Sequence, residues 1–229
     1  IFAFVSSQTS LQNHFRYVLP ALPYWVIFLG RAGALFGAAT RCAQAVVAVA
    51  LAWAIGSYVA VHPHALPYFN ELGGGPDNGH DHLLGSNIDW GQDLWRLKRW
   101  VEDHPEARPI RIAYFNHIDP RVVGLDFSLP PPGPVAGPPN EPADEINHGP
   151  QPGYFAISVR FVRGNQAAPP DGRGGYKLMP AHALSYFHKF RPVAKAGYSI
   201  FIYRITLEEA NAVRAELGQP LLPSDWIGE

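Results

Sequence analysis

The organisation of this chain is decided by the stretch AQAVVAVALAWAIGSYVAV, residues 43–61. It carries no charged side chain, and Gln44 is its one strongly polar side chain. At 1.5 Å per residue, a helix of this length covers about 28 Å, close to the roughly 30 Å hydrocarbon core of a bilayer. We therefore predict a membrane span over residues 43–61; the alternative is a buried helix of a soluble protein.

A second apolar run, residues 17–36, contains Pro20 and Pro23 and is interrupted by Arg31. Membrane helices tolerate proline where neighbouring helices satisfy the freed carbonyls. We predict a kinked span here. The chain also begins at Ile1, without a methionine and inside an apolar run. We expect further membrane helices to precede it, so residues 1–61 would form the end of a multi-span helical bundle.

The orientation of the bundle follows from the distribution of basic residues. Arg31 and Arg41 flank the short turn between the two predicted spans, whereas the opposite loop, residues 6–16, carries only Arg16. Basic loops stay in the cytoplasm. The prediction is a multi-pass protein of the cell (inner) membrane whose C-terminal domain is extracytoplasmic.

Residues 62–229 are predicted to form a small soluble α/β domain. Its start, residues 62–85, is rich in turn residues, and a Pro/Gly-rich, flexible excursion covers residues 129–152. Apolar runs predict strands over residues 110–115, 154–162 and 199–205, with a short one at 122–127. Helical spacing of Trp90, Leu94, Leu97 and Val101 predicts a main helix, and two further helices are expected over residues 184–190 and 207–217.

Composition excludes some classes of partner. The net charge is −1, so no basic balance favours nucleic acid. Cys42 is the single cysteine, so no internal disulfide can form.

The segment SNIDWGQD, residues 86–93, places several polar groups beside Trp90. Asp89, followed three residues later by Gln92, fits a capping box at a helix start. Asn87, Asp89 and Gln92 next to an aromatic ring also suit binding of sugar hydroxyls. Both interpretations stay open from the residues alone.

Two further groups of residues are candidates for binding. Four loop histidines and two aspartates could hold a metal, although paired histidines on loops are weak spacing evidence and solvated side chains are the alternative: His62, His64, His80, His82, Asp77 and Asp81. In the segment NHFRY, residues 13–17, His14 and Arg16 could hold a lipid phosphate through charge-assisted hydrogen bonds, or anchor the chain at the interface.

Several of these segments together resemble a known family. NHFRYVLPALP, residues 13–23, is similar to the N-x-H-x-R-Y-x-L-P-x-x-P segment near the last membrane helices of bacterial GT-C glycosyltransferases, which are related to the dolichyl-phosphate-mannose–protein mannosyltransferases. PYFNEL, residues 67–72, and SNIDWGQDL, residues 86–94, resemble the segment after the membrane in the same proteins. Residues 154–162 and 197–205 fit that tail as well.

The resemblance implies an integral-membrane enzyme that moves a sugar from a polyprenyl-phosphate donor to a protein or glycan acceptor on the outer face of the bilayer. The family's catalytic acidic residue lies in its first outer loop, so it is expected upstream of Ile1. His14, Arg16 and Tyr17 would bind the donor phosphate, and Asn87, Asp89 and Gln92 would shape the acceptor side. The resemblance leaves a divalent metal cofactor open. The alternative function is a non-catalytic, membrane-anchored binding or scaffold module.

Overall fold

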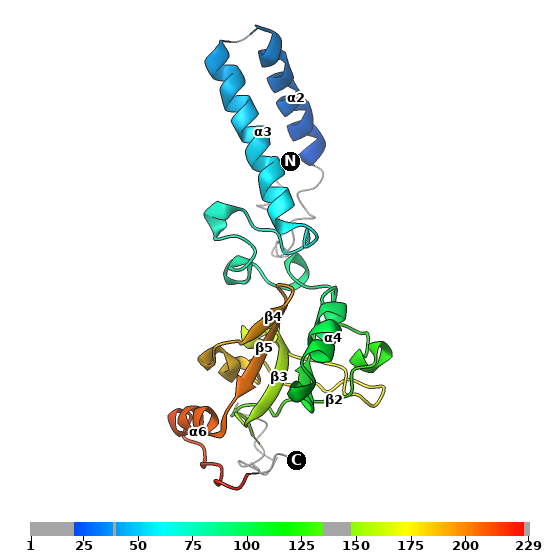
Figure 1. Cartoon of the computed structure of the whole chain (residues 1–229), viewed down its shortest axis with the longest axis vertical. Coiled ribbons are helices and arrows are strands. Elements are labelled where there is room, and N and C mark those ends of the chain that lie inside the picture. Colours follow the sequence, from blue (N-terminus) through cyan, green and yellow to red (C-terminus); the bar gives the residue numbers. More distant parts are fainter. Residues whose placement is uncertain (1–20, 39, 135–147, 227–229) are drawn as a thin grey trace. The chain divides into compact units, whose positions relative to one another are not determined.

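The fold was analysed in a computed structural model, which describes residues 21–38, 40–134 and 148–226. The chain divides into two compact units, residues 1–88 and 89–229. Figure 1 shows the helical first unit in blue and cyan, and the second unit, built around a sheet, in green to red. Each unit is described by itself.

The first unit contains two helices that contact each other, α2 (Leu22–Ala38) and α3 (Arg41–Val61). Among the described residues, α3 alone is long and apolar enough to cross a membrane. The helix predicted over residues 43–61 is therefore confirmed, and its crossing of a bilayer stays a prediction. Exposed apolar side chains along both helices, such as Ile27 (72% exposed) and Ile55 (64%), are compatible with a lipid environment. A larger helical bundle stays an expectation.

After α3 the chain forms a series of tight turns, as its glycines and prolines predict. Three 3-10 turns follow one another: η2 (Glu71–Gly73), η3 (Gly79–Asp81) and η4 (Gly85–Asn87). The Asn70 side chain caps η2 by accepting the Gly73 N–H at 2.9 Å. The His82 ring stacks on Phe69, with 6.0 Å between ring centroids, and forms a 3.0 Å hydrogen bond with the Gly73 carbonyl. The turn region is thus held by specific side chains.

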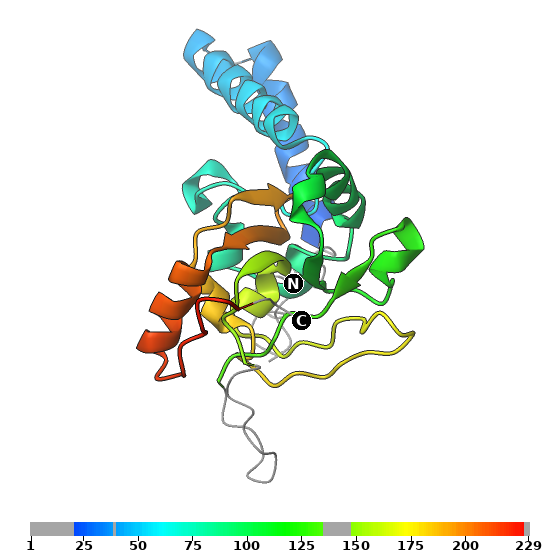
Figure 2. The same ribbon diagram turned by 60° about the horizontal axis from the view of Figure 1, so that its bottom comes forward.

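The second unit is built on a mixed five-stranded sheet (Figure 2). The strands lie in the order β2-β1-β3-β5-β4. Their bounds are β1 (Ile110–Ala113), β2 (Phe127–Ser128), β3 (Gly153–Ser158), β4 (Ala194–Ala196) and β5 (Ile200–Ile205). β1 is parallel to both β2 and β3, whereas β5 runs antiparallel to β3 and β4. A small α/β domain is therefore confirmed.

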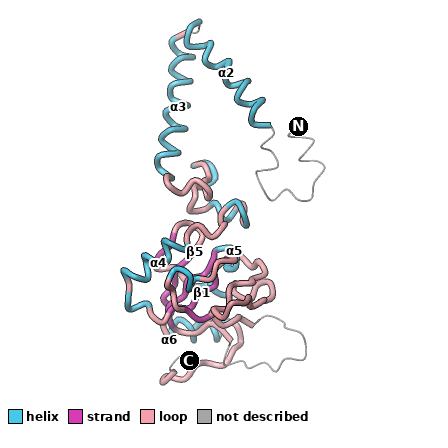
Figure 3. Tube along the Cα trace, turned by 90° about the vertical axis from the view of Figure 1, so that its right-hand side faces the viewer, coloured by secondary structure: helices cyan, strands magenta, loops and turns pink. Residues whose placement is uncertain are grey.

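Helices and 3-10 turns join and cover these strands, and long loops make up much of the remainder (Figure 3). They are α4 (Leu94–Asp103), α5 (Val159–Val162), α6 (Leu207–Glu216), η5 (Pro105–Ala107), η6 (Pro120–Val123) and η7 (Ser185–Lys189). α6 begins with a capping box, in which Thr206 and Glu209 exchange hydrogen bonds.

Alternate residues of each central strand enter two different cores. Ile200 and Ile202 of β5 pack in one cluster with Leu97 and Val101 of α4. On the other face, Phe187 of η7 packs against Phe155 of β3 and Tyr203 of β5. The ring centroid of Phe187 lies 5.2 Å from that of Phe155 and 5.1 Å from that of Tyr203. The period-2 pattern of the strands thus places the sheet between α4 and η7.

Several elements differ from the predictions. The strand predicted over residues 122–127 is wrong in its bounds, because Asp119 caps a 3-10 turn, η6, at Pro120–Val123, and β2 covers only Phe127–Ser128. α4 begins at Leu94, so Trp90 lies before the helix and is 58% exposed. The reason is Gly91, whose φ of +81° is incompatible with a right-handed helix. β3 ends at Ser158 because its partner β5 begins opposite, at Ile200, and α5 follows. β4, with Lys195 at its centre, was not predicted, since three residues are too few to show a period.

The Pro/Gly-rich excursion, residues 129–152, is fixed at both described ends. The Tyr186 hydroxyl donates to the Pro131 carbonyl at 2.9 Å. The buried Arg214 guanidinium donates to the carbonyls of His148 at 2.6 Å and Pro150 at 3.1 Å. The central part of the predicted excursion, residues 135–147, lies outside the described residues.

Candidate functional site

A polar cluster forms at one edge of the sheet. The parallel strands β1 and β3 end there, at Ala113 and Ser158, and the antiparallel β5 begins at the same edge, at Ile200. In open α/β sheets, ligands bind outside the carboxyl ends of the parallel strands. We use the name edge site for the polar residues gathered here: Asp89, Asp93, Ser158 and Ser199 at its floor, and Trp90, Gln92, Asn116 and Arg160 around them.

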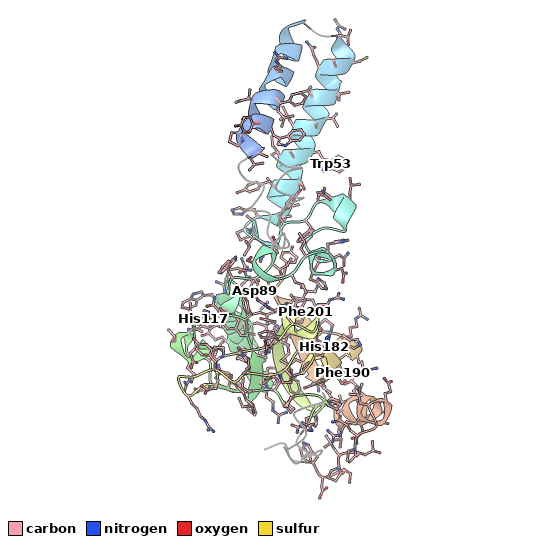
Figure 4. All side chains as sticks on the ribbon, turned by 180° about the vertical axis from the view of Figure 1, so that it is seen from behind. Trp53, Asp89, His117, His182, Phe190 and Phe201 are labelled. Atoms are coloured by element: carbon pink, nitrogen blue, oxygen red, sulfur yellow. The ribbon has the colours of Figure 1, made fainter. Side chains whose placement is uncertain are left out.

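Asp89, which is labelled in Figure 4, links two strand ends through hydrogen bonds. Its side chain is only 1% exposed. One carboxylate oxygen accepts the Ser158 hydroxyl at 3.2 Å, and the other accepts the Gly91 N–H at 2.7 Å. The Ser158 hydroxyl in turn accepts the Phe115 N–H at 2.9 Å. A single hydrogen-bonded chain therefore connects the segment before α4 with the ends of β1 and β3.

Burial raises the pKa of the Asp89 carboxyl to about 6. Desolvation is the main cause, because it disfavours the charged form, and the neighbouring Asp93 carboxylate adds to it. The hydrogen bonds from Gly91 and Ser158 and the positive charge of Arg160 act in the opposite direction. The edge site thus contains a carboxyl group that titrates near neutral pH.

Asp93 makes a second link across the edge and is fully buried. Its Oδ2 accepts the Ser199 hydroxyl at 2.8 Å and the Ser199 N–H at 3.3 Å. Its Oδ1 lies 3.3 Å from Nε of Arg96. Gly197 permits this approach, since a Cβ at that position would lie 2.1 Å from Asp93. The carboxylate therefore holds the start of β5 against the start of α4.

The turn between the two aspartates is fixed by the chain that follows β1. The Tyr114 hydroxyl donates to the Gly91 carbonyl at 2.8 Å, and the Asn116 amide donates to the Trp90 carbonyl at 2.6 Å. Desolvation raises the pKa of Tyr114, so its hydroxyl stays protonated as a donor. Gly91 is required at this point: a Cβ would lie 1.9 Å from the Asn116 side-chain nitrogen.

The outward side of the edge site is aromatic and polar. The Arg160 guanidinium lies 3.7 Å above the centroid of the Phe115 ring, and burial lowers its pKa. Its Nε atom is buried without a hydrogen-bond partner. Trp90 and Gln92 are exposed on either side of Gly91, in the turn between the two aspartates. An exposed indole with amide and guanidinium groups can stack on, and hydrogen-bond to, a polar ligand.

The predicted acceptor-side residues differ in their exposure and in the contacts they make. Asp89 faces inward, whereas Gln92 is exposed and accepts the Trp90 N–H at 2.8 Å. Asn87 belongs to the first unit and donates to the Leu84 carbonyl at 3.1 Å. The capping-box interpretation of Asp89 and Gln92 is wrong, because α4 begins at Leu94 and no side chain caps it.

The predicted donor-phosphate residues, His14, Arg16 and Tyr17, lie outside the described residues. Within residues 21–38, 40–134 and 148–226, no group of three or more His, Cys, Asp or Glu side chains could hold a metal ion. Of the four loop histidines, His82 is bonded to a backbone carbonyl, and Nε2 of His80 lies 3.9 Å from Asp81.

Ser158, Ser199 and Arg160 were missed as site residues in the sequence. Two of them carried a signal: Ser158 and Arg160 interrupt the apolar run YFAISVRFV, residues 154–162. A polar residue inside a buried strand needs a partner, which points to a site at the strand end. No family model, curated protein or solved structure matches this chain.

Proposed function

We propose that this chain is the C-terminal part of an integral-membrane glycosyltransferase. It moves a sugar from a polyprenyl-phosphate donor to a protein or glycan acceptor on the outer face of the cell (inner) membrane. The support is the family resemblance of residues 13–23 and 86–94, together with a helix of spanning length, α3, that precedes a small α/β unit.

The main support for the proposal is the position of residues 86–94, the segment whose resemblance to the family is most specific. Within SNIDWGQDL, residues 86–94, Asp89 and Asp93 bond the strand ends at the edge site, and Trp90 and Gln92 are exposed there. Aromatic rings stack on sugar rings, and amides bond their hydroxyls. In this proposal Trp90 and Gln92 contact the acceptor. Asp89 positions the turn from below and does not contact the ligand, because it is buried.

Sugar transfer from a polyprenyl phosphate requires two kinds of group in the enzyme. A carboxylate must activate the acceptor hydroxyl, and cations must stabilise the leaving polyprenyl phosphate. The first group is expected in an outer loop upstream of Ile1. His14, Arg16 and Tyr17 are proposed for the second role. A divalent metal could share it, and the described residues assign no ligands to one.

The proposal is tested by measuring acceptor use in the full-length protein. Trp90→Ala should raise the KM for the acceptor by about two- to tenfold, since packing against an aromatic ring contributes on the order of 0.5–1.5 kcal/mol. The KM for the lipid-linked donor should not change. Trp95→Ala is the matched control, because Trp95 is equally exposed (65%) but lies on the outer face of α4. Unchanged acceptor KM in Trp90→Ala would refute the role of the edge site.

A non-catalytic, membrane-anchored binding or scaffold module is the second candidate. One observation favours it: both carboxylates of the edge site are buried, Asp89 bonded to Ser158 and Gly91, and Asp93 bonded to Ser199 and paired with Arg96. Such a module would bind its partner through the same exposed residues. The full-length protein would then bind a glycan or protein at the edge site but transfer no sugar.

A further inference from the structure

A second polar cluster lies in the first unit, where the loop after α3 returns to the helix. Glu71 accepts the Trp53 indole N–H at 3.0 Å through Oε2. Its Oε1 accepts the Ser57 hydroxyl at 2.5 Å. Ser57 has one hydrogen, which this bond uses, so the Tyr68 hydroxyl, 3.0 Å away, donates to Ser57. Tyr68, Ser57 and Glu71 thus form a directed chain of hydrogen bonds, which polarise one another.

The carboxylate remains open to ligands. Glu71 and Trp53 are exposed, Trp53 by 58%, and Tyr68 is 43% exposed. Trp53 donates through Nε1–H at the edge of its ring, so this hydrogen bond does not occupy a ring face. An ionised carboxylate has about four acceptor positions, so the two bonds from α3 leave capacity for further donors.

The cluster of Trp53, Ser57 and Glu71 lies well before the C-terminal end of α3. Trp53 precedes the last residue of the helix, Val61, by eight positions, or about 12 Å. In a bilayer crossed by α3 with its C-terminal end outside, the Glu71 carboxylate, bonded to Trp53 and Ser57, would lie within the outer leaflet, about 6–12 Å below the end of the span. Ionisable groups at such depth are costly and typically functional. A loop anchor alone would not need an exposed carboxylate there.

We propose that Trp53, Tyr68 and Glu71 form a binding site for the sugar group of a membrane lipid. The exposed carboxylate accepts sugar hydroxyls in charge-assisted hydrogen bonds, and the two aromatic rings pack against the apolar face of the sugar. The lipid chain would lie along α3. That the lipid is the polyprenyl-linked donor rests on the proposed function; that the site takes a sugar rests on the contacts of these three side chains.

The test uses the full-length protein in phosphatidylcholine nanodiscs. The probes are a short-chain polyprenyl phosphate mannose and the same polyprenyl phosphate without sugar, with binding read from tryptophan fluorescence. Glu71→Gln keeps the size of the side chain and an acceptor for Ser57 but removes the charge. It should weaken binding of the mannose-bearing lipid by about tenfold or more, as for loss of a charge-assisted hydrogen bond. Binding of the sugar-free lipid should not change.

Glu106 is an exposed glutamate of η5, so Glu106→Gln is the matched control and should bind both probes normally.

Equal binding of the mannose-bearing lipid by wild type and Glu71→Gln would show that Glu71 is not part of a sugar-binding site. So would equal losses for both probes, which would mark Glu71 as a loop anchor. A Glu71 effect that appears only in phosphatidylethanolamine nanodiscs would assign the carboxylate to an amine headgroup and would also overturn it. If methyl α-mannoside bound as tightly as the mannose-bearing lipid, the proposal of a lipid-binding site would be wrong, because the lipid chain would contribute nothing to binding.

Failure of the site and failure of the proposed function give different results. If the protein transfers sugar and Glu71→Gln binds normally, the function stands and the site falls. If Glu71→Gln loses mannose-lipid binding but no transfer occurs in the wild type, the site stands without the enzyme.

Discussion

Replacement of Asp89 by asparagine should change how folding stability depends on pH. Burial raises the pKa of Asp89 to about 6 in the folded protein, from an ordinary value of 3.8. Between these two values the native state binds more protons than the unfolded chain. Stability from this group is therefore fully present below about pH 4 and is lost as the pH rises through about 6.

The size of the effect follows from the shift. A pKa difference of about two units corresponds to about 3 kcal/mol, at about 1.4 kcal/mol per unit. The free energy of unfolding of the wild type should thus fall by up to about 3 kcal/mol between pH 4 and pH 7 from this group alone. Asp89→Asn is nearly isosteric and cannot ionise, so its contribution should be flat across the same interval.

The assay is urea unfolding of the full chain in nanodiscs at half-unit steps of pH, followed by tryptophan fluorescence. The informative quantity is the difference in unfolding free energy between wild type and variant at each pH. Asp103→Asn, which removes an exposed carboxylate at the end of α4, is the control and should track the wild type. Parallel curves for wild type and Asp89→Asn would refute the reasoning, because they would mean that Asp89 has the same pKa in the folded and unfolded states.

Two further substitutions test the edge site. Gly91→Ala places a Cβ 1.9 Å from the Asn116 side chain at a φ of +81°, and it should destabilise by more than about 2 kcal/mol. Gly124→Ala has a similar φ of +82° but open space, so it should cost about 1 kcal/mol, and equal losses in urea melts would contradict the packing argument. Ser199→Ala removes a hydroxyl donor from the buried Asp93 and should cost about 1–3 kcal/mol. An unchanged unfolding midpoint would show that this bond is replaced.

Local patterns were enough to predict most of the elements. The apolar runs at residues 110–115 and 199–205 became β1 and β5, and the amphipathic run at 207–217 became α6. Each signal is contained within a few consecutive residues, and burial of one face then fixes the strand or helix. The helix over residues 43–61 was predicted for the same reason, since its composition is uniform.

The edge site could not be assembled from the sequence, because its contacts join distant segments. Asp89 bonds Ser158 across 69 positions, and Asp93 bonds Ser199 across 106. The pattern of Asp89 and Gln92 is compatible with a capping box, and only the fold shows that Gly91 delays the helix to Leu94. Local chemistry singled out a polar segment that the fold places at the edge site, whereas the contacts of each residue depend on the strand ends that meet it.

The most direct test of the proposed function is a transfer assay with the full-length protein in proteoliposomes. A radiolabelled polyprenyl-phosphate sugar would be supplied as donor, and incorporation of label into protein or glycan acceptors would be measured. We predict transfer by the wild type, and loss of transfer in Arg16→Ala at normal membrane insertion, because Arg16 is proposed to stabilise the leaving phosphate. No transfer by the wild type with any lipid-linked sugar would contradict the enzyme and favour the anchored binding module. Normal transfer by Arg16→Ala would contradict the phosphate role alone.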